Sequence, residues 1–263
     1  PLFPYPTLFR SLSAADLAYK QKDFPRAARI LEQVPVDTLK PAQQVFASTL
    51  AAELAMSRNQ PKAALAALAH PSLQHTAELP AEQQVRTYSV HAAALEADGQ
   101  ALPAAQQRVL LAPLLSGAAA SANNDAIWAL VAALPAEQLQ QPGTDPVLNG
   151  WASLALAVKS AGTLEQQQAA IDAWVKQHPD HPAAQQLPSA LTKLKALASQ
   201  PLTKIALLLP QEGPLAGVAR ALRDGFMAAH LQAQQSGQPT PAVQVVDSSR
   251  IGSLDDFYRQ AQA

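Results

Sequence analysis

The sequence contains no cysteine among its 263 residues, which excludes disulfide bonds, thiol catalysis and cysteine-based metal sites. Aromatic residues make up only 5% of the chain. The 19 lysines and arginines are balanced by 20 aspartates and glutamates. Because binding to nucleic acid needs a basic face, this balance argues against a nucleic-acid partner. No run of apolar residues approaches the roughly 18 that a membrane-spanning helix needs. The lack of cysteine suits the periplasm as well as the cytosol.

The motifs of common enzymes are missing as well. The chain has no G-x-S-x-G nucleophile elbow, no G-x-x-x-x-G-K-[ST] phosphate loop and no H-E-x-x-H zinc motif. Its serines, histidines and aspartates follow no spacing that indicates a catalytic triad. We therefore expect a protein that is not an enzyme and that uses no cofactor.

The densest group of potential metal ligands is His178-Pro-Asp-His181. Pro179 and Pro182 break the helix there, so the two imidazoles do not share a helix face, and a metal site needs three or four convergent ligands. The interpretation that we favour is a helix end, a turn and a new helix, with Asp180 or His181 near the cap.

Other side chains that could carry chemistry have simpler interpretations. We expect His70 and His75 to be solvated loop residues, Glu53, Glu96 and Glu165 to be solvated helix residues, and Trp128, Trp151 and Trp174 to pack in the core.

Alanine and leucine dominate the first 200 residues, and many of the 22 prolines stand where a helical pattern begins. Proline is tolerated in the first turn because its missing N–H has no partner there. The patterns predict helices over 13–21, 24–34, 41–57, 61–69, 80–97, 102–112, 123–134, 146–160, 164–177 and 183–198. Asp145-Pro146 marks one helix start, and Thr163 with Gln166 forms a capping box at another.

The predicted helices form pairs with a recurrent pattern of small and large residues. Successive pairs begin near Ala14, Ala51 and His91, a spacing of roughly 36 to 40 residues that is near the tetratricopeptide period of about 34. A last pair begins near Ala152. One such pair cannot bury its apolar face alone, so neighbours stack into a continuous core. The array offers a concave surface for another protein, or serves as a plain structural spacer.

The pattern changes after residue 200. Ile205–Leu209 forms an apolar run that ends at Pro210, an amphipathic helix follows, and Ala242–Asp247 forms a second apolar run. This order predicts the first β-α-β unit of a parallel sheet. We expect two domains, a mainly α tetratricopeptide-like solenoid over 1–200 and an incomplete α/β domain over 201–263. Only 61 residues follow position 202, so we expect a fragment cut inside its second domain.

The loop after the first predicted strand holds the candidate ligand residues Gln211, Glu212 and Gly213. Ligands of parallel sheets bind beyond the carboxyl ends of the strands, and a helix N-terminus favours anions. The loop lacks the G-x-G-x-x-G spacing, which argues against a dinucleotide, and Glu212 argues against a phosphate. The alternative is a tight turn from strand to helix that binds nothing.

The run Leu207–His230, LLLPQEGPLAGVARALRDGFMAAH, resembles the first βα unit of type I periplasmic binding proteins. Pro210, Gly213-Pro-Leu-Ala216 and Asp224-Gly-Phe226 carry this likeness. Because a helical-repeat region stands directly before it, and because Trp174–Leu191 is also similar, the whole chain resembles the LpoA (LppC) family of bacterial outer-membrane lipoproteins.

The resemblance implies a regulator of peptidoglycan synthesis on the periplasmic side of the outer membrane. Members are held there by a lipidated N-terminal cysteine and activate a class A penicillin-binding protein by direct contact. The chain begins at Pro1, so we expect the anchoring cysteine to have been removed with the signal sequence. Peptidoglycan is a second candidate partner. The alternative is a periplasmic solute receptor for an amino acid or a similar small ligand.

Overall fold

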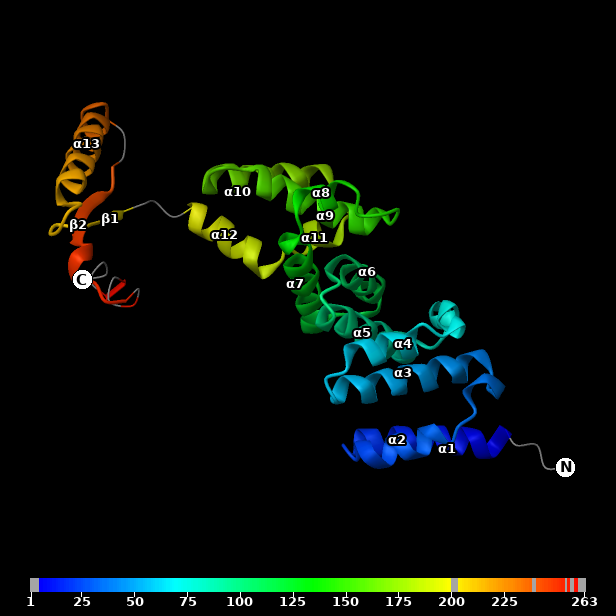
Figure 1. Cartoon of the computed structure of the whole chain (residues 1–263). Helices are drawn as coiled ribbons and strands as arrows, with labels where there is room; N and C mark the ends of the chain where they lie inside the picture. Colours follow the sequence, from blue (N-terminus) through cyan, green and yellow to red (C-terminus); the bar gives the residue numbers. More distant parts are fainter. Residues whose placement is uncertain (1–4, 200–202, 238–239, 254, 256–257, 260–263) are drawn as a thin grey trace. The chain divides into compact units, whose positions relative to one another are not determined.

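A computed structural model describes residues 5–199, 203–237, 240–253, 255 and 258–259 of the chain (Figure 1). The chain forms two compact units, Pro1–Leu197 and Ala198–Ala263, and each is described by itself. The domain boundary predicted at residue 200 falls on 200–202, which lie outside the described residues.

The first unit is built from α-helices joined by short turns. In chain order they are α1 (Tyr5–Lys20), α2 (Phe24–Glu32), α3 (Pro41–Ser57), α4 (Pro61–Leu68), α5 (Ala81–Ala97), α6 (Ala101–Leu111), α7 (Gly117–Ala133), α8 (Ala136–Gln140), α9 (Pro146–Ser160), α10 (Leu164–Gln177), α11 (Pro182–Gln185) and α12 (Ser189–Ser199). Three short 3₁₀ segments, η1 (Val36–Thr38), η2 (Pro71–Glu78) and η3 (Ala112–Leu114), lie between them. The mainly α fold predicted from the sequence is confirmed.

Consecutive helices pack as pairs, α1 with α2, α3 with α4, α5 with α6 and α9 with α10. Contacts of α3 with α5 and of α6 with α7 join one pair to the next. Figure 1 shows the pairs following one another from blue to yellow. Each pair thus buries its apolar residues against its neighbours, as expected for a helical-repeat array.

The first three pairs share one turn. Lys22, Asn59 and Gly99 have left-handed φ angles of 62°, 57° and 78°. In each turn the N–H of this residue donates to the carbonyl three residues earlier, and the next N–H donates to the carbonyl five residues earlier. This is the Schellman ending of a helix. The three turns lie 37 and 40 residues apart (59 − 22 and 99 − 59), so the backbone repeats with the period that the sequence predicts.

Alanine is frequent among the buried residues through which these helices pack. Ala15, Ala18 and Ala27 pack with Leu50 and Leu54 in one cluster of buried residues. Ala52, Ala64 and Ala94 are fully buried in the next. A side chain of one methyl group lets two helix backbones come close, which is why the composition favours helix-on-helix packing over a β-sandwich.

Several predicted boundaries were wrong. Helix α7 begins at Gly117 rather than at residue 123, and the five-residue α8 was missed. The helix predicted over 183–198 is two helices, because Pro188 disfavours helical backbone at the residue before it. Asp125 then accepts a hydrogen bond from the backbone N–H of Ser189 at 2.6 Å, which satisfies a free donor at the start of α12.

His75 lies in the 3₁₀ helix η2 rather than in an open loop, and His70 is the N-cap of that helix. His70 is half-buried, and its Nδ1 accepts a hydrogen bond from the N–H of Ser72 at 3.2 Å. Ser72 and Thr76 are buried. The expectation of solvated loop residues was therefore wrong for His70, which caps a helical turn.

Glu53 and Glu96 are not the solvated residues that the sequence predicts, whereas Glu165 is exposed. Glu53 on α3 accepts a hydrogen bond from Arg86 Nε on α5 at 2.6 Å, and Glu96 pairs with Arg108. Arg86 Nη1 also lies 2.6 Å from Asp16 Oδ1 on α1, as a close charge contact rather than an aligned hydrogen bond. One arginine thus ties three helices together.

Arg86, Asp16 and Glu53 form a group that we call the Arg86 triad. It is largely removed from water, because these side chains are only 20%, 13% and 12% exposed. Burial opposes the charged form of Arg86, but the Glu53 hydrogen bonds and the negative charges of Glu53 and Asp16 outweigh it and raise the arginine pKa. The Arg86 guanidinium also lies 5.3 Å from the ring centroid of Phe46. The triad sets the register of the first three helix pairs.

The last helix pair is organised around tryptophan and histidine. Trp128, Trp151 and Trp174 are all buried, as predicted. The rings of Trp174 and His178 stack with centroids 4.5 Å apart, and the edge of His181 meets Trp174 at 5.0 Å.

His181 is the N-cap of α11, which confirms its predicted place near a cap. Its Nδ1 accepts from the N–H of Ala183 at 3.1 Å, and its Nε2–H donates to the carbonyl of Val147 at 2.9 Å. Gly150 on α9 provides the space, because a Cβ there would lie 2.4 Å from the imidazole. The motif that the sequence offers as a metal candidate is therefore a structural joint between α9, α10 and α11.

The second unit has the predicted order of strand, helix and strand. Strand β1 (Lys204–Leu209) pairs in parallel with β2 (Ala242–Asp247), from Lys204 opposite Ala242 to Leu209 opposite Asp247. Helix α13 (Ala216–Gln235) packs on β1, and the 3₁₀ turn η4 (Ser248–Arg250) follows β2.

The apolar core of this unit is small. Among its described residues only Ala219 and Val246 are buried. Leu215 at the N-cap of α13, and Val218 and Leu222 within the helix, are each more than half exposed. Two strands with one covering helix bury little apolar surface, so the unit contributes little stability of its own.

We expect Arg86→Met to lower the free energy of unfolding by about 3 kcal/mol, because it leaves the partly buried Glu53 carboxylate without its counter-charge and leaves Asp16 with only the largely exposed Lys20. Urea unfolding followed by circular dichroism measures the change. The control is Arg108→Met, which breaks a single pair whose glutamate side chain is 31% exposed and is expected to cost about 1 kcal/mol or less. Equal losses in the two variants would contradict the role of the triad.

A second expectation concerns pH. Burial lowers the pKa of His181 from its ordinary 6.5, and the nearby His178 acts in the same direction against the Val147 hydrogen bond. Below pH 6.5 the unfolded chain takes up a proton that the folded chain excludes. Stability is therefore retained above that pH and lost as the pH falls towards the lowered pKa of the folded state.

The measurement is the free energy of unfolding between pH 7.5 and 5 for the natural chain and for His181→Asn, in which asparagine can still cap α11. The variant should lose less stability per pH unit, by up to about 1.4 kcal/mol. Burial also lowers the pKa of His91, so His91→Asn is the matched comparison. An unchanged pH slope in His181→Asn would refute the assignment to His181.

Candidate functional site

The loop after β1 carries the three predicted ligand residues, and all three are exposed. The backbone N–H of Gln211 donates to Asp247 Oδ1 at 2.9 Å, and the Glu212 carboxylate pairs with Arg250 Nη2 at 2.8 Å. Gly213 has φ +86°, a conformation that favours glycine, and its carbonyl accepts from the N–H of Ala216. The loop is thus tied to the end of β2.

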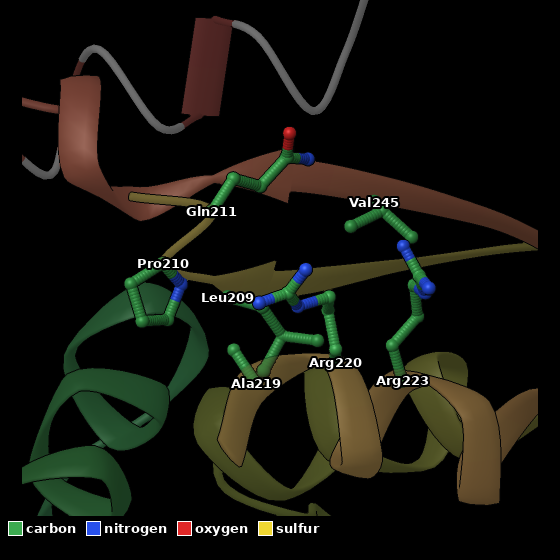
Figure 2. A pocket seen from close by; sticks show the side chains of 7 residues that line it. All are labelled: Leu209, Pro210, Gln211, Ala219, Arg220, Arg223 and Val245. Atoms are coloured by element: carbon green, nitrogen blue, oxygen red, sulfur yellow. The ribbon is translucent and has the colours of Figure 1, made fainter. Parts of the chain in front are cut away.

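Beside this loop lies a cavity of about 180 Å³ between α13 and the two strands (Figure 2). Of the three predicted residues only Gln211 lines it, and in Figure 2 its side chain points away from the two arginines. The arginines, Arg220 and Arg223, rise from α13 towards Leu209 and Val245. Neither arginine is among the ligand residues predicted from the sequence, although their spacing of three residues places both on one face of the helix.

Some of the charged groups around this cavity already form ion pairs or hydrogen bonds within the chain. Arg223 pairs with Asp224 at 2.8 Å. At the end of β2, the hydrogen bond from the Ser249 hydroxyl, together with the Gln211 N–H, lowers the pKa of Asp247. The remaining guanidinium capacity suits one small anionic group. The described lining of this cavity offers groups that can bind an anion, and it contains no nucleophile beside a neighbouring base.

A second hollow, in the first unit, has a different lining. It measures about 570 Å³ and lies between the segment after α8 and one face of α9, lined by Leu139, Gln140, Gln141, Pro142, Gly143, Asn149, Ser153 and Leu156. We refer to it as the Asn149 hollow. Asn149 Oδ1 is buried and accepts no hydrogen bond from the described residues. No sequence pattern singles out Asn149, because it lines the hollow only through the path of the segment after α8.

Metal and membrane sites are not indicated by the described residues. Across that part of the chain, no group of three or more histidine, cysteine, aspartate or glutamate side chains is placed to hold a metal ion. Within the same residues, every helix is too short or too polar to cross a membrane.

The family comparison covers nearly the whole chain. The model of the family described as "LppC putative lipoprotein" matches residues 8–263. A Vibrio cholerae protein named penicillin-binding protein activator LpoA is 28% identical over 256 residues, which is 95% of this chain and 42% of the relative. Relatives of the same name in Edwardsiella piscicida and Dickeya chrysanthemi are 33% and 32% identical over 85% and 88% of this chain.

Solved structures give the same fold. Full-length LpoA from Haemophilus influenzae matches all of this chain over 47% of its own length, with a TM-score of 0.57 and 23% identity. The amino-terminal domain of E. coli LpoA matches 69% of this chain with a TM-score of 0.56 and 24% identity. The chain therefore spans less than half the length of the first relatives that it matches.

These matches confirm the resemblance that residues 174–230 carry in the sequence. From the first helix pair to the end of β2, the described architecture agrees with it. The chain belongs to the LppC putative lipoprotein family.

Proposed function

We propose that this chain is part of a regulator that activates a penicillin-binding protein and so controls peptidoglycan synthesis. The observation that carries the proposal is the match over 95% of the chain to a protein named for this activity. The chain spans 42% of that relative, so activation by these residues alone is a separate part of the proposal.

The partner is a class A penicillin-binding protein, and the regulator acts by contact rather than by catalysis. The described surfaces support a binding role: a helical array held in register by the Arg86 triad, and cavities lined by arginines or amides instead of activated nucleophiles. The family description as a lipoprotein supports a lipid anchor in the outer membrane and a location on its periplasmic side. Peptidoglycan is a second candidate partner within that location.

The helical unit would supply length and rigidity, and the α/β unit would supply partner contacts. The exposed apolar residues Leu215, Val218 and Leu222, at the N-cap and in the first turns of α13, support the second role, because large exposed apolar groups mark surfaces that other protein segments cover. The receptor alternative has less support, because the relatives are named as activators and the arginine cavity measures only about 180 Å³, below the range typical of small-molecule sites.

The test is retention of a purified, detergent-solubilised class A penicillin-binding protein on the immobilised chain. We expect retention, and a faster rate of peptide cross-linking when the chain is added to the enzyme. The Vibrio cholerae relative is the matched positive control. If the relative retains the enzyme and this chain does not, the activator role of these residues is wrong. Saturable binding of an amino acid by calorimetry, without retention, would reinstate the receptor.

A further inference from the structure

The Asn149 hollow is lined by a residue whose side-chain oxygen is buried without a hydrogen bond from the described residues, which lowers the stability of the fold. Asn149 lies within α9, where asparagine is less favourable than alanine. Its Oδ1 is buried without a partner among the described residues, although buried carbonyl oxygens are nearly always hydrogen-bonded. Residues that lower stability without a compensating contact are typical of functional sites.

The neighbouring polar group is already satisfied. The Ser153 hydroxyl donates to the carbonyl of Gly150 at 2.8 Å and accepts from the indole N–H of Trp174 at 2.8 Å. Asn149, Ser153 and Leu156 are spaced by four and three residues, so they lie on one face of α9. Asn149 is therefore the group on this face with spare hydrogen-bonding capacity.

The chemistry of the hollow selects its ligand. A carboxamide offers an acceptor and a donor side by side, which matches the N–H and C=O of an extended peptide. Leu139, Pro142 and Leu156 supply apolar contacts for side chains, and none of the described lining residues is charged or aromatic. A sugar ring would lack a flat aromatic surface to stack on. Trp151 Nε1 is also buried without a partner among the described residues, but the whole Trp151 residue is 0% exposed, whereas Asn149 is partly exposed and lines the hollow. Rotation about the last torsion of its side chain, which is broad for asparagine, turns the amide towards a ligand.

We propose that the Asn149 hollow binds an extended, uncharged peptide segment, with Asn149 pairing to its backbone amide and the apolar lining holding its side chains. The inference does not rest on the activator role. A chain that retains no penicillin-binding protein can still bind a peptide here, and the reverse also holds.

The test uses the whole ¹⁵N-labelled chain, with acetylated penta-alanine amide as the probe. The readout is the indole N–H signal of Trp174, which reports on the hollow through its hydrogen bond to Ser153. We expect a saturable shift, and an affinity at least tenfold weaker in Asn149→Ala. Asn149→Asp should also bind weakly, because a carboxylate has lost the donor. Gln106→Ala removes an exposed amide from α6 and should bind as the natural chain does.

A second measurement separates binding from a structural role. Because the unpaired amide costs stability, Asn149→Ala should melt at a temperature no lower than that of the natural chain. A lower melting temperature would make the amide structural and overturn the proposal. So would equal binding by Asn149→Ala, or no shift of the Trp174 signal up to the solubility limit of the peptide. A shift caused by chitotetraose and not by the peptide would replace the peptide by an N-acetyl sugar.

Discussion

A hairpin of two alanine- and leucine-rich helices cannot bury its apolar face within itself, and the first unit is the consequence of that constraint. Burial requires a neighbour on each side, and close approach requires small residues at the crossing points. Ala15, Ala52 and Ala94 are fully buried between the helices. The same left-handed turn at Lys22, Asn59 and Gly99 returns the chain at the same angle each time, so the stacking continues from pair to pair.

Apolar stacking alone is tolerant of sliding, and polar contacts between pairs remove that freedom. The Arg86 triad joins α1, α3 and α5, and the hydroxyls of Thr49 and Thr87 meet at 2.8 Å in the buried contact between α3 and α5. Each polar atom buried there needs one particular partner, so a shift by one turn would leave it unsatisfied. These contacts thus fix how each helix pair sits on the next.

The two units place their binding capacity in different kinds of surface. The α/β unit buries few residues and exposes an apolar stripe on α13 beside an arginine-lined cavity. The helical unit is well packed, and its least satisfied polar group faces the Asn149 hollow. Both surfaces fit a protein that works by holding other molecules.

The sequence by itself determined the helical class, the repeat spacing, most helix starts and the β-α-β order, because these depend on local periodicity, proline positions and caps such as that of Thr163. It could not determine which polar residues meet. Glu53 and Arg86 are 33 residues apart in the chain, and only the stacking of α3 on α5 makes them a buried pair. His178 and His181 look like metal ligands in one dimension, but packing against Trp174 and Gly150 makes them a joint. The tertiary structure alone decided that Gln211 turns away from its cavity, that Arg220 and Arg223 line it, and that Asn149 faces a hollow, because the lining of a cavity comes from segments that the chain brings together only when it folds.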